Sequence, residues 1–340
     1  MEKEVTIYDI AKLLDLSAAT VSRALNNHPA ININTRRTVH AKATELGYRS
    51  NKFASNLRKK TTHTLGVIVP RLNSHFMSSV LAGMEVVANQ ADYHLLISQS
   101  LESYQNEKAN AQTMFNNRVD GLLVSMAYDT QNFDHFSGFV NKQVPLLFFD
   151  RVIDFMDCPG IVIDNFKGGY DATKHLLDQG CKRILHVAGN IERNVYKDRM
   201  MGYQQALRDF GIEPEEGLLV VNDLSAEAGV AVAEHITTMK SKPDGVFISS
   251  DMCAVNCMKT LKKKGYQIPE EIAFVGFNND HVSQIIEPNL TTIDYPGREM
   301  GELAMTTMIN HLKGIQLMKN TNSIVLRSGL VVRESSMRKI

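Results

Sequence analysis

The stretch TIYDIAKLLDLSAATVSRAL, residues 6–25, decides how the N-terminal part of this chain of 340 residues folds. Thr6 followed three positions later by Asp9 has the form of a capping box, so a short helix is expected to begin here. Ser17 can cap a second short helix, whose predicted buried positions are Val21, Ala24 and Leu25. Two short helices joined by so few residues must cross steeply, which is typical of a helix-turn-helix.

The second helix turns mainly short side chains outward: Ser17, Ala18, Ala19, Ser22, Arg23 and Asn26. Short side chains let a backbone approach the edges of DNA bases, and Arg23 is long enough for a bidentate contact to guanine. Short polar residues also cap any helical hairpin. The pattern alone therefore leaves a solvated helical surface open as the alternative.

A third helix is predicted over residues 35–46, capped by Asn32 or Asn34 and ended by Gly47. Its apolar face consists of Val39, Ala43 and Leu46. Three helices within the first 50 residues can close a small core. The polar, basic residues 51–61 then form a hinge or linker.

The net charge of zero conceals an asymmetry between the two parts of the chain. Residues 1–60 hold eleven Lys or Arg against five Asp or Glu, so this head carries +6 and the remaining 280 residues carry −6. A basic head on a mildly acidic body indicates that the head alone meets a polyanion.

From residue 64 onward, apolar runs of strand length alternate with amphipathic segments. The predicted strands are 65–69, 93–97, 121–124, 146–149, 184–188, 217–221, 245–248 and 272–276. Continuous apolar runs are typical of parallel strands covered on both faces. Residues 119–125 and 243–249 share one pattern, which predicts two similar doubly wound α/β lobes with a cleft between them.

Ligands of open α/β sheets bind beyond the carboxyl ends of the strands, so the polar residues that follow the predicted strands are the candidates. They are Arg71, Asn73, His75, Ser125, Asp150, Arg151, Asp164, Asn165, Asn190, Ser250, Asp251, Asn278 and Asn279, with Arg199 in a following helix. Phe76, Phe149, Phe277 or Tyr295 can cover an apolar ligand face. Such a set of donors and acceptors suits a polyhydroxylated ligand.

Other classes of function are disfavoured. The sequence has no phosphate-binding glycine loop, nucleophile elbow or zinc-protease motif, so we expect no enzyme, although Asp150, Asp164 and Asp251 are candidate carboxylates for glycoside chemistry. Cys158, Cys181, Cys253 and Cys257 are irregularly spaced, which indicates reduced thiols, with Cys253 and Cys257 packed in a core. We expect no cofactor and no metal. The N-terminus lacks the apolar segment of a signal peptide, so we expect a cytoplasmic protein with no membrane segment.

The residues of the head resemble the DNA-binding head of the LacI/GalR family of bacterial repressors. The resemblance rests on residues 5–11, 16–26, 35–37 with 39, 46–48 and 51–57. It implies phosphate or groove-edge contacts from Thr6, Ser17, Thr20, Ser22, Asn26, Thr35 and Tyr48, and base contacts from Ala18, Ala19 and Arg23. It also implies a hinge helix that forms on operator DNA from residues 51–58, including Asn51 and Ala54, with Leu57 wedged into the minor groove.

The body resembles the type I periplasmic-binding-protein fold that this family shares with sugar receptors. Asp150 and Arg151 are similar to the Asp-Arg pair of pentose-binding members, and Arg199 to the arginine that clamps the effector. The sequence departs from the family pattern at Asn278, where an aspartate is usual, and at Leu224, where some members have an aromatic. The predicted effector contacts are His75, Phe76, Ser125, Asp150, Arg151, Arg199, Leu224, Ser250, Asn278 and Tyr295.

The resemblance implies three parts. Residues 1–50 form the DNA-binding head, 51–61 the hinge, and 62–340 the effector-binding and dimerisation domain. The two subdomains comprise about 62–163 with 293–322, and about 164–292 with 323–340, because the lobes exchange strands near Ile163, Thr292 and Asn322. The expected partners are double-stranded operator DNA, a small-molecule effector and a second copy of the chain. A carbohydrate is the first choice of effector, a purine or nucleoside the second and a phosphoprotein co-repressor the third; a sugar receptor without DNA activity is the competing class.

Overall fold

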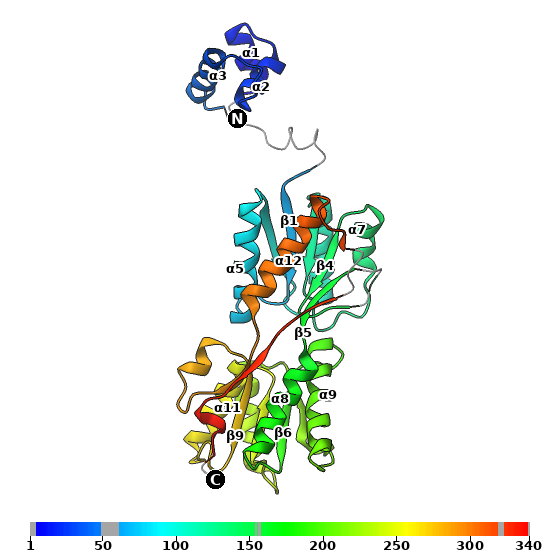
Figure 1. Ribbon diagram of the computed structural model, residues 1–340, viewed down its shortest axis with the longest axis vertical. Coiled ribbons are helices and arrows are strands. Elements are labelled where there is room, and N and C mark those ends of the chain that lie inside the picture. The colour runs from blue at the N-terminus through cyan, green and yellow to red at the C-terminus, as the bar shows by residue number, and fades with distance from the viewer. Residues whose placement is uncertain (1–4, 49–60, 154, 156–157, 319–322, 339–340) are drawn as a thin grey trace. The chain divides into compact units, whose positions relative to one another are not determined.

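The computed structural model describes residues 5–48, 61–153, 155, 158–318 and 323–338 (Figure 1). It divides into two compact units, a head within Met1–Thr62 and a body of His63–Ile340. The predicted residues Asn51, Ala54 and Leu57 lie outside the described residues.

The head contains three helices, α1 (Ile7–Leu14), α2 (Ala18–Leu25) and α3 (Ile33–Glu45). Thr6 and Asp9 form the predicted capping box, in which the Thr6 amide donates to Asp9 Oδ2 over 2.8 Å. Ser17 Oγ accepts from the Thr20 amide at the start of α2. Asn32 caps α3, so that helix begins two residues before the predicted start.

The core of the head lies where the three helices meet. Its buried side chains are Ile10, Ala11, Val21, Ala24, Val39 and Ala43. Leu25 and Leu46, which we predicted as core positions, are only half-buried against this cluster. The core is small, and helix caps therefore contribute a sizeable share of the stability of the head.

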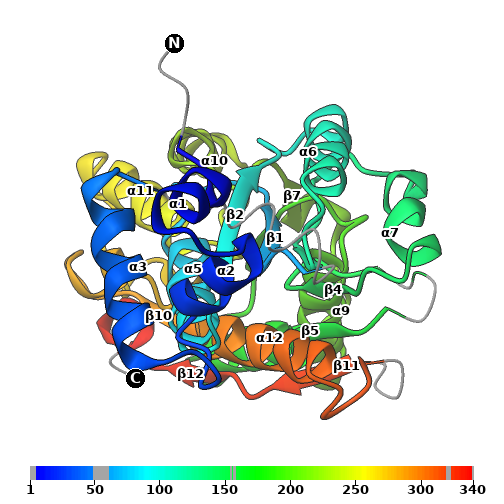
Figure 2. The ribbon, with the colours of Figure 1, turned by 90° about the horizontal axis from the view of Figure 1, so that it is seen from above.

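The first lobe of the body is built on a six-stranded sheet of order β11-β5-β4-β3-β1-β2, all of whose pairs are parallel. The strands are β1 (Thr64–Val69), β2 (His94–Gln99), β3 (Gly121–Val124), β4 (Leu146–Phe149), β5 (Gly160–Ile163) and β11 (Ser323–Leu326). Leu65 and Val67 face α5 (His75–Gln90) and α12 (Gly297–Leu312). Ile68 faces α6 (Tyr104–Asn116), and α7 (Ser137–Asn141) lies on the same side (Figure 2).

The second lobe repeats this plan with the order β12-β10-β9-β8-β6-β7. The strands are β6 (Ile184–Ala188), β7 (Leu219–Val221), β8 (Gly245–Ile248), β9 (Ala273–Asn278), β10 (Thr291–Asp294) and β12 (Gly329–Val331). One face packs on α8 (Asn165–Asp178) and α9 (Asn194–Asp209), the other on α10 (Ala226–Thr238) and α11 (Asp251–Lys263). Only β12 pairs in antiparallel fashion among the described strands. The predicted fold class, an all-α helix-turn-helix head plus two doubly wound parallel-sheet subdomains, is confirmed.

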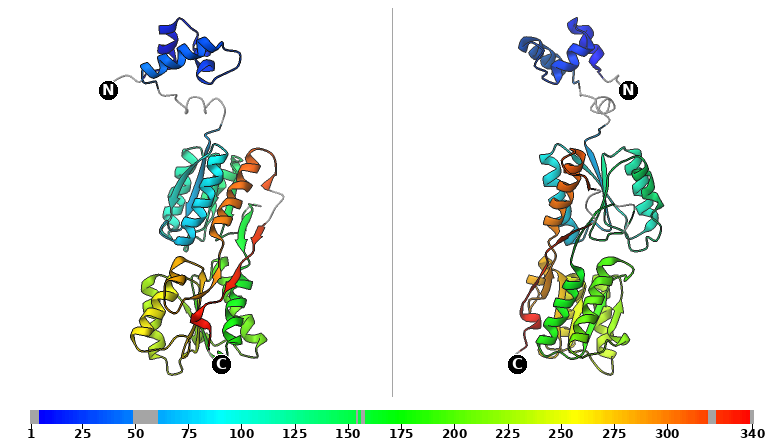
Figure 3. Two further views of the ribbon diagram at one scale, coloured as in Figure 1. Left: turned by 60° about the vertical axis from the view of Figure 1, so that its left-hand side comes forward. Right: turned by 45° about the vertical axis from the view of Figure 1, so that its right-hand side comes forward.

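The chain passes between the lobes three times (Figure 3). It leaves the first sheet after Ile163 and returns after β10, which still belongs to the second sheet. Asn322 lies outside the described residues, but β11 pairs with β5, so the third exchange comes after Leu326 and not at residue 322. The return comes after Asp294 and not at Thr292, because β10 pairs with β9 over its whole length.

Two strands differ from their prediction. β2 is an edge strand with no fully buried residue. The prediction that both of its faces are covered is therefore wrong for this strand. β7 begins only at Leu219, because residues 216–218 form a 3-10 turn. Both strands lie at the outer edge of their sheet, where one neighbour is missing and the pattern of burial is weaker.

Cys253 and Cys257 lie on the inner side of α11 within a hydrophobic cluster, as predicted. Burial raises the pKa of Cys253 to about 12. At neutral pH this thiol therefore stays protonated, which suits a packing role.

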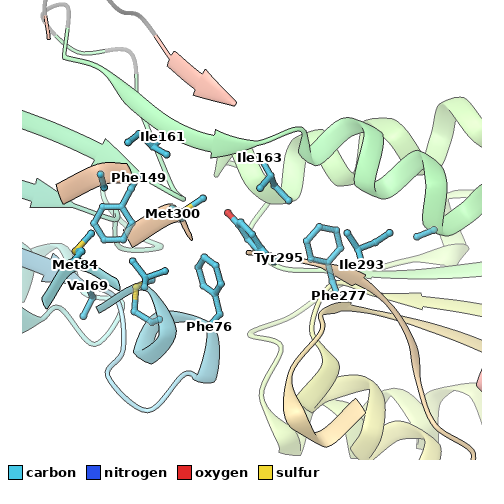
Figure 4. Close-up of a cluster of buried hydrophobic side chains, with 14 of the residues drawn as sticks. Val69, Phe76, Met84, Phe149, Ile161, Ile163, Phe277, Ile293, Tyr295 and Met300 are labelled. Carbon is cyan, nitrogen blue, oxygen red and sulfur yellow. The ribbon is translucent and has the colours of Figure 1, made fainter. Parts of the chain in front are cut away.

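The two lobes share apolar contacts next to the cleft. Phe76 of the first lobe stacks on Tyr295 with ring centroids 4.1 Å apart, and Tyr295 meets the edge of Phe277 at 5.9 Å (Figure 4). These rings are buried. They therefore form one side of the space in which the strand ends of both lobes meet.

Candidate functional site

The ten predicted DNA-binding residues that the structure describes remain accessible on the head. Thr6, Ser17, Ala19, Arg23 and Asn26 are exposed. Ala18, Thr20, Ser22, Thr35 and Tyr48 are half-buried. An accessible row along the first turns of α2 is what a helix needs in order to enter a DNA groove.

Several of these side chains are held in place by the helix ends. Ser17 Oγ lies 2.8 Å from Thr20 Oγ1, and the Asn26 amide donates to the Ser22 carbonyl over 2.8 Å. The Arg23 guanidinium makes no hydrogen bond or ion pair to any residue that the structure describes. Tyr8, which we did not predict, is 71% exposed on α1 and adds an aromatic ring to the surface of the head.

A cavity of about 150 Å³ lies in the body where strand ends of the two lobes meet. Its wall comprises Pro70, Arg71, Ser74, Phe76, Met77, Glu102, Tyr128, Asp150, Arg151, Val195, Tyr196, Arg199, Asp223, Leu224, Ser249, Ser250, Asn278 and Tyr295. An apolar cavity of similar volume in another protein holds one benzene molecule, so a single ring fits here. The parallel strands bring these residues together because their carboxyl ends meet at one edge of each sheet.

Eight of the ten predicted effector contacts line this cavity: Phe76, Asp150, Arg151, Arg199, Leu224, Ser250, Asn278 and Tyr295. Ser125 does not; it is buried behind the wall and its hydroxyl donates to Asp150 Oδ2 over 3.0 Å. His75 lies beside the cavity, where Nδ1 is 3.1 Å from Asp280 Oδ1 across the lobes. The side chain of each is aimed at another protein group, which is why neither reaches the wall.

Asp150 stands at the end of β4 with both carboxylate oxygens engaged. Tyr295 Oη donates to Oδ1 over 2.7 Å, and Ser125 Oγ binds Oδ2. Burial and the adjacent Asp150 raise the pKa of Tyr295 well above its usual value, so its hydroxyl keeps its proton. The hydroxyls orient a buried carboxylate toward the cavity.

Three residues of the wall have a positive φ: Asp150 at 59°, Leu224 at 56° and Asn278 at 117°. Residues with side chains rarely occupy this region, and such strain concentrates at functional sites. Asp150 directly follows β4, Asn278 is the last residue of β9, and Leu224 lies in the loop after β7. Their backbone conformation turns the side chains toward the cavity.

Arg151 is held by a carboxylate and two aromatic rings. Nη1 donates to Glu102 Oε2 over 2.7 Å, and the guanidinium carbon lies 4.1 Å from the centre of the Tyr128 ring. Nη2 donates to Tyr196 Oη, which accepts also from Tyr128 Oη. Glu102, Tyr128 and Tyr196 were not predicted. Glu102 follows β2 as other candidates follow their strands, but the apolar run that predicts this strand ends at Ile97, two residues before β2 does.

Hydrogen bonds join the two lobes on the same side of the cavity. The side chain of Asn190 donates to the Tyr128 carbonyl, and that of Arg193 donates to the Thr130 carbonyl over 2.7 Å. Asn194 Oδ1 accepts from the Val152 amide. These side chains of the second lobe bind backbone of the first, so the lobes are in direct contact around the cavity.

The carboxylates that we considered for glycoside chemistry do not converge. Asp164 is exposed and caps α8 by accepting from the Lys167 amide. Asp251 is buried outside the cavity wall, where burial and Asp280 raise its pKa to about 7. Of the three candidates, only Asp150 lines the cavity.

Two features are absent from the residues that the structure describes. No group of three or more His, Cys, Asp or Glu side chains is arranged to hold a metal ion. No described helix is both long and apolar enough to cross a membrane.

Replacing Gly169 by alanine is expected to disturb the cavity from behind. A Cβ atom at this position of α8 would lie 2.1 Å from the Arg199 carbonyl of α9, so the helix that carries Arg199 must shift. Such overpacking costs about 1–3 kcal/mol, measured as the free energy of unfolding in urea. Gly217→Ala is the matched control, because nothing lies within 4 Å of its Cβ position. Equal stability of the two variants would contradict the close helix contact.

Both the head and the body of the chain match families of known proteins. Residues 6–51 match the family described as "Bacterial regulatory proteins, lacI family", and residues 173–336 match the "Periplasmic binding protein-like domain". The ribose operon repressor of Haemophilus influenzae is 30% identical over 332 residues, covering 97% of this chain and 98% of that protein.

Two solved structures extend the comparison. The transcriptional regulator CelR in complex with cellobiose has 25% identity and a TM-score of 0.74, and the match covers 98% of this chain and all of that one. The Lac repressor dimer bound to operator and an anti-inducer has 24% identity and a TM-score of 0.87, covering 99% of this chain and all of that one. At that identity the second match supports the fold alone.

Proposed function

Since the chain belongs to the LacI family of bacterial regulatory proteins, we propose that it represses transcription at an operator under the control of a carbohydrate effector. Regulators of this family are not enzymes. The observation that carries the proposal is the union of two features in one chain: an accessible helix-turn-helix on a basic head, and a polar cavity between two lobes. As a DNA-binding regulator it acts in the cytoplasm.

The wall of the cavity supports a carbohydrate. It offers carboxylate, amide, hydroxyl and guanidinium groups, while Phe76, Tyr295 and Leu224 provide apolar surface for one face of a ring. The names of two similar proteins, a ribose operon repressor and a regulator in complex with cellobiose, point the same way. A nucleoside is the second candidate, because Tyr128 and Tyr196 also line the cavity and can stack on a base.

A homodimer is supported by apolar side chains around the edge strand β2. Ile97 is 39% exposed on this strand and Leu101 is 55% exposed just beyond it. Leu72 is exposed beside them, with its amide bound to Gln99 of β2. An unpaired strand edge with exposed apolar residues is a surface suited to a second subunit.

In such a dimer, two heads bind the two halves of a pseudo-palindromic operator. An effector that closes or twists the lobes alters the spacing of the heads and so the affinity for DNA. Coupling of this kind is reciprocal, so operator DNA must change effector affinity by the same factor.

The proposal is tested by incubating the purified full chain with fragments of its own genome and excess bulk competitor DNA. A repressor retains a small set of fragments, and retention changes when the right sugar or nucleoside is added. A thermal-shift screen of sugars and nucleosides identifies that effector, because a ligand of the folded state stabilises it. Retention of no fragment above competitor would refute the DNA-binding function.

Arg23→Ala is expected to relax the base preference of the head. Loss of a bidentate contact to a base costs about 1–3 kcal/mol per half-site and falls on one operator position. Binding to a panel of half-site variants measures this. Lys12→Ala, which removes an exposed charge from α1, is the control and should leave the preference unchanged. An Arg23→Ala protein that ranks the half-sites as the wild type does would contradict base reading by Arg23.

A further inference from the structure

Arg199 is a buried guanidinium without an ionic partner. The residue is only 3% exposed, and its Cζ lies 3.5 Å from the centre of the Phe277 ring. Nε donates to Asn165 Oδ1 over 2.9 Å and Nη1 to the Ser249 carbonyl over 3.4 Å. Throughout the described part of the chain, no carboxylate lies within ion-pair distance of it. Three of its five N–H donors are therefore free.

Arg151, in the same cavity wall, provides the contrast. It is buried to a similar extent, but Glu102 lies 2.7 Å from its Nη1. Burial acts against the charge of Arg151, yet Tyr196 and Glu102 hold its pKa well above the usual value. Burial lowers the pKa of Arg199 instead, and nearby groups, Asp150 among them, offset this only in part. A buried charge without a partner is costly, so the cavity as it stands favours a negative charge beside Arg199.

The acids near the cavity do not fill this role. Asp150 is buried, but Tyr295 and Ser125 already donate to its two oxygens, and no hydrogen bond joins it to Arg199. Glu102 is bound to Arg151, and Asp223, which also lines the wall, accepts from the Ser225 amide over 3.1 Å. Asn278, which also lines the wall, contributes a neutral amide.

A second donor lies beside Arg199. Ser249 is 2% exposed, lines the cavity, and its Oγ finds no hydrogen-bond partner among the described residues. Its own carbonyl accepts from Arg199, so the free hydroxyl and the free guanidinium N–H groups belong to one corner of the cavity. Several unpaired donors, one of them charged, match the acceptors of a carboxylate or phosphate group.

We propose that the effector carries an oxyanion group, which Arg199 and Ser249 bind in this corner. The inference deepens the proposed function, because it narrows the effector from a carbohydrate to an acidic one: a sugar acid or a sugar phosphate. The volume of about 150 Å³ accommodates a single ring and favours a monosaccharide. The effector supplies the charge that Arg199 lacks and leaves the Arg151–Glu102 pair intact.

Inorganic phosphate is the first probe, since it carries the proposed group and nothing else. Added to the full chain at constant ionic strength, it is expected to raise the Tm in a saturable way, whereas chloride does not. Glucose, glucuronate and glucose 6-phosphate are then compared by calorimetry. Either glucuronate or glucose 6-phosphate should bind at least tenfold more tightly than glucose. Which of the two binds more tightly shows whether the site prefers a carboxylate or a phosphate.

Arg199→Gln should weaken phosphate binding at least tenfold. Ser249→Ala is the second variant, because it removes only a hydroxyl that has no internal partner and should fold normally; a loss of about tenfold is expected. Lys259→Gln, on the exposed side of α11, removes one positive charge from the body outside the cavity wall and is the control.

Three results would overturn the inference: no stabilisation of the wild type by phosphate, an undiminished response in Ser249→Ala together with Arg199→Gln, or glucose binding as tightly as both acidic sugars. The test of DNA binding by genomic fragments can fail without affecting the test of the oxyanion site. A chain that retains no genomic fragment but responds to phosphate through Arg199 keeps the oxyanion site and loses the repressor function, and the reverse result separates them equally well.

Discussion

Raising the salt concentration from 50 to 200 mM should weaken operator binding by about 10³-fold or more. The head carries a net charge of +6, and the proposed dimer would present two heads to the DNA phosphates. Each neutralised phosphate releases condensed counterions, and a protein that makes about 6–10 such contacts loses about 10³–10⁵ in affinity over this range. Fluorescence anisotropy with a labelled operator fragment measures the slope of log affinity against log salt.

The slope separates binding by the head from adventitious binding by the body. Lys259→Gln should leave it unchanged, since this exposed lysine belongs to the body. Effector binding should respond far less, because the corner that contains Arg199 is buried and buried pairs are weakly screened. An operator affinity that stays within tenfold across the range would mean that the basic head is not the DNA-binding surface.

Local signals were strong enough to predict the head. Thr6, Asp9, Ser17 and Gly47 mark helix ends through interactions within a few residues, and those interactions are present in the structure. The start of α3 was predicted late because Ile33 and Asn34, an exposed pair, carry no helix pattern. Asn32 decides the start instead, by accepting from the Asn34 amide.

The strands that escaped prediction are short and lie where the lobes exchange chain. β5, β10, β11 and β12 have three or four residues each. Strands so short give no periodicity to read, and β11 and β12 are recruited by partners far away in sequence, β5 and β10. The central strands β3, β4 and β8 are equally short but fully buried, so their apolar residues alone identified them.

Much of the candidate site followed from one rule, that ligands bind beyond the carboxyl ends of parallel strands. The rule found Asp150, Ser250 and Asn278, which line the cavity. The rule does not identify Tyr196 or the free hydroxyl of Ser249. Whether a side chain faces the cavity depends on how its helix or strand is oriented in the fold, and the local sequence does not show this. The pairing of Arg151 with Glu102, 49 residues apart, likewise leaves no trace in the local pattern.

Arg151→Met should be the most destabilising single change in the cavity wall, lowering the free energy of unfolding of the body by about 3 kcal/mol. The substitution keeps an unbranched apolar stem but leaves the carboxylate of Glu102, whose side chain is 12% exposed, without its partner at 2.7 Å. Arg71 lies 3.8 Å from the other oxygen of Glu102 but is half exposed, so it can compensate only in part. Urea denaturation followed by circular dichroism measures the loss.

The cost arises from an uncompensated buried charge, and two further variants isolate that cause. Arg151→Met combined with Glu102→Gln removes both charges and should recover most of the stability, because a neutral amide is far cheaper to bury than a carboxylate. Arg298→Met breaks an ion pair with Glu302 that is exposed on α12 and should cost no more than about 0.5 kcal/mol. If the exposed and the buried pair cost the same, or if the double variant is as unstable as the single one, the Arg151–Glu102 pair is not what holds this wall of the cavity together.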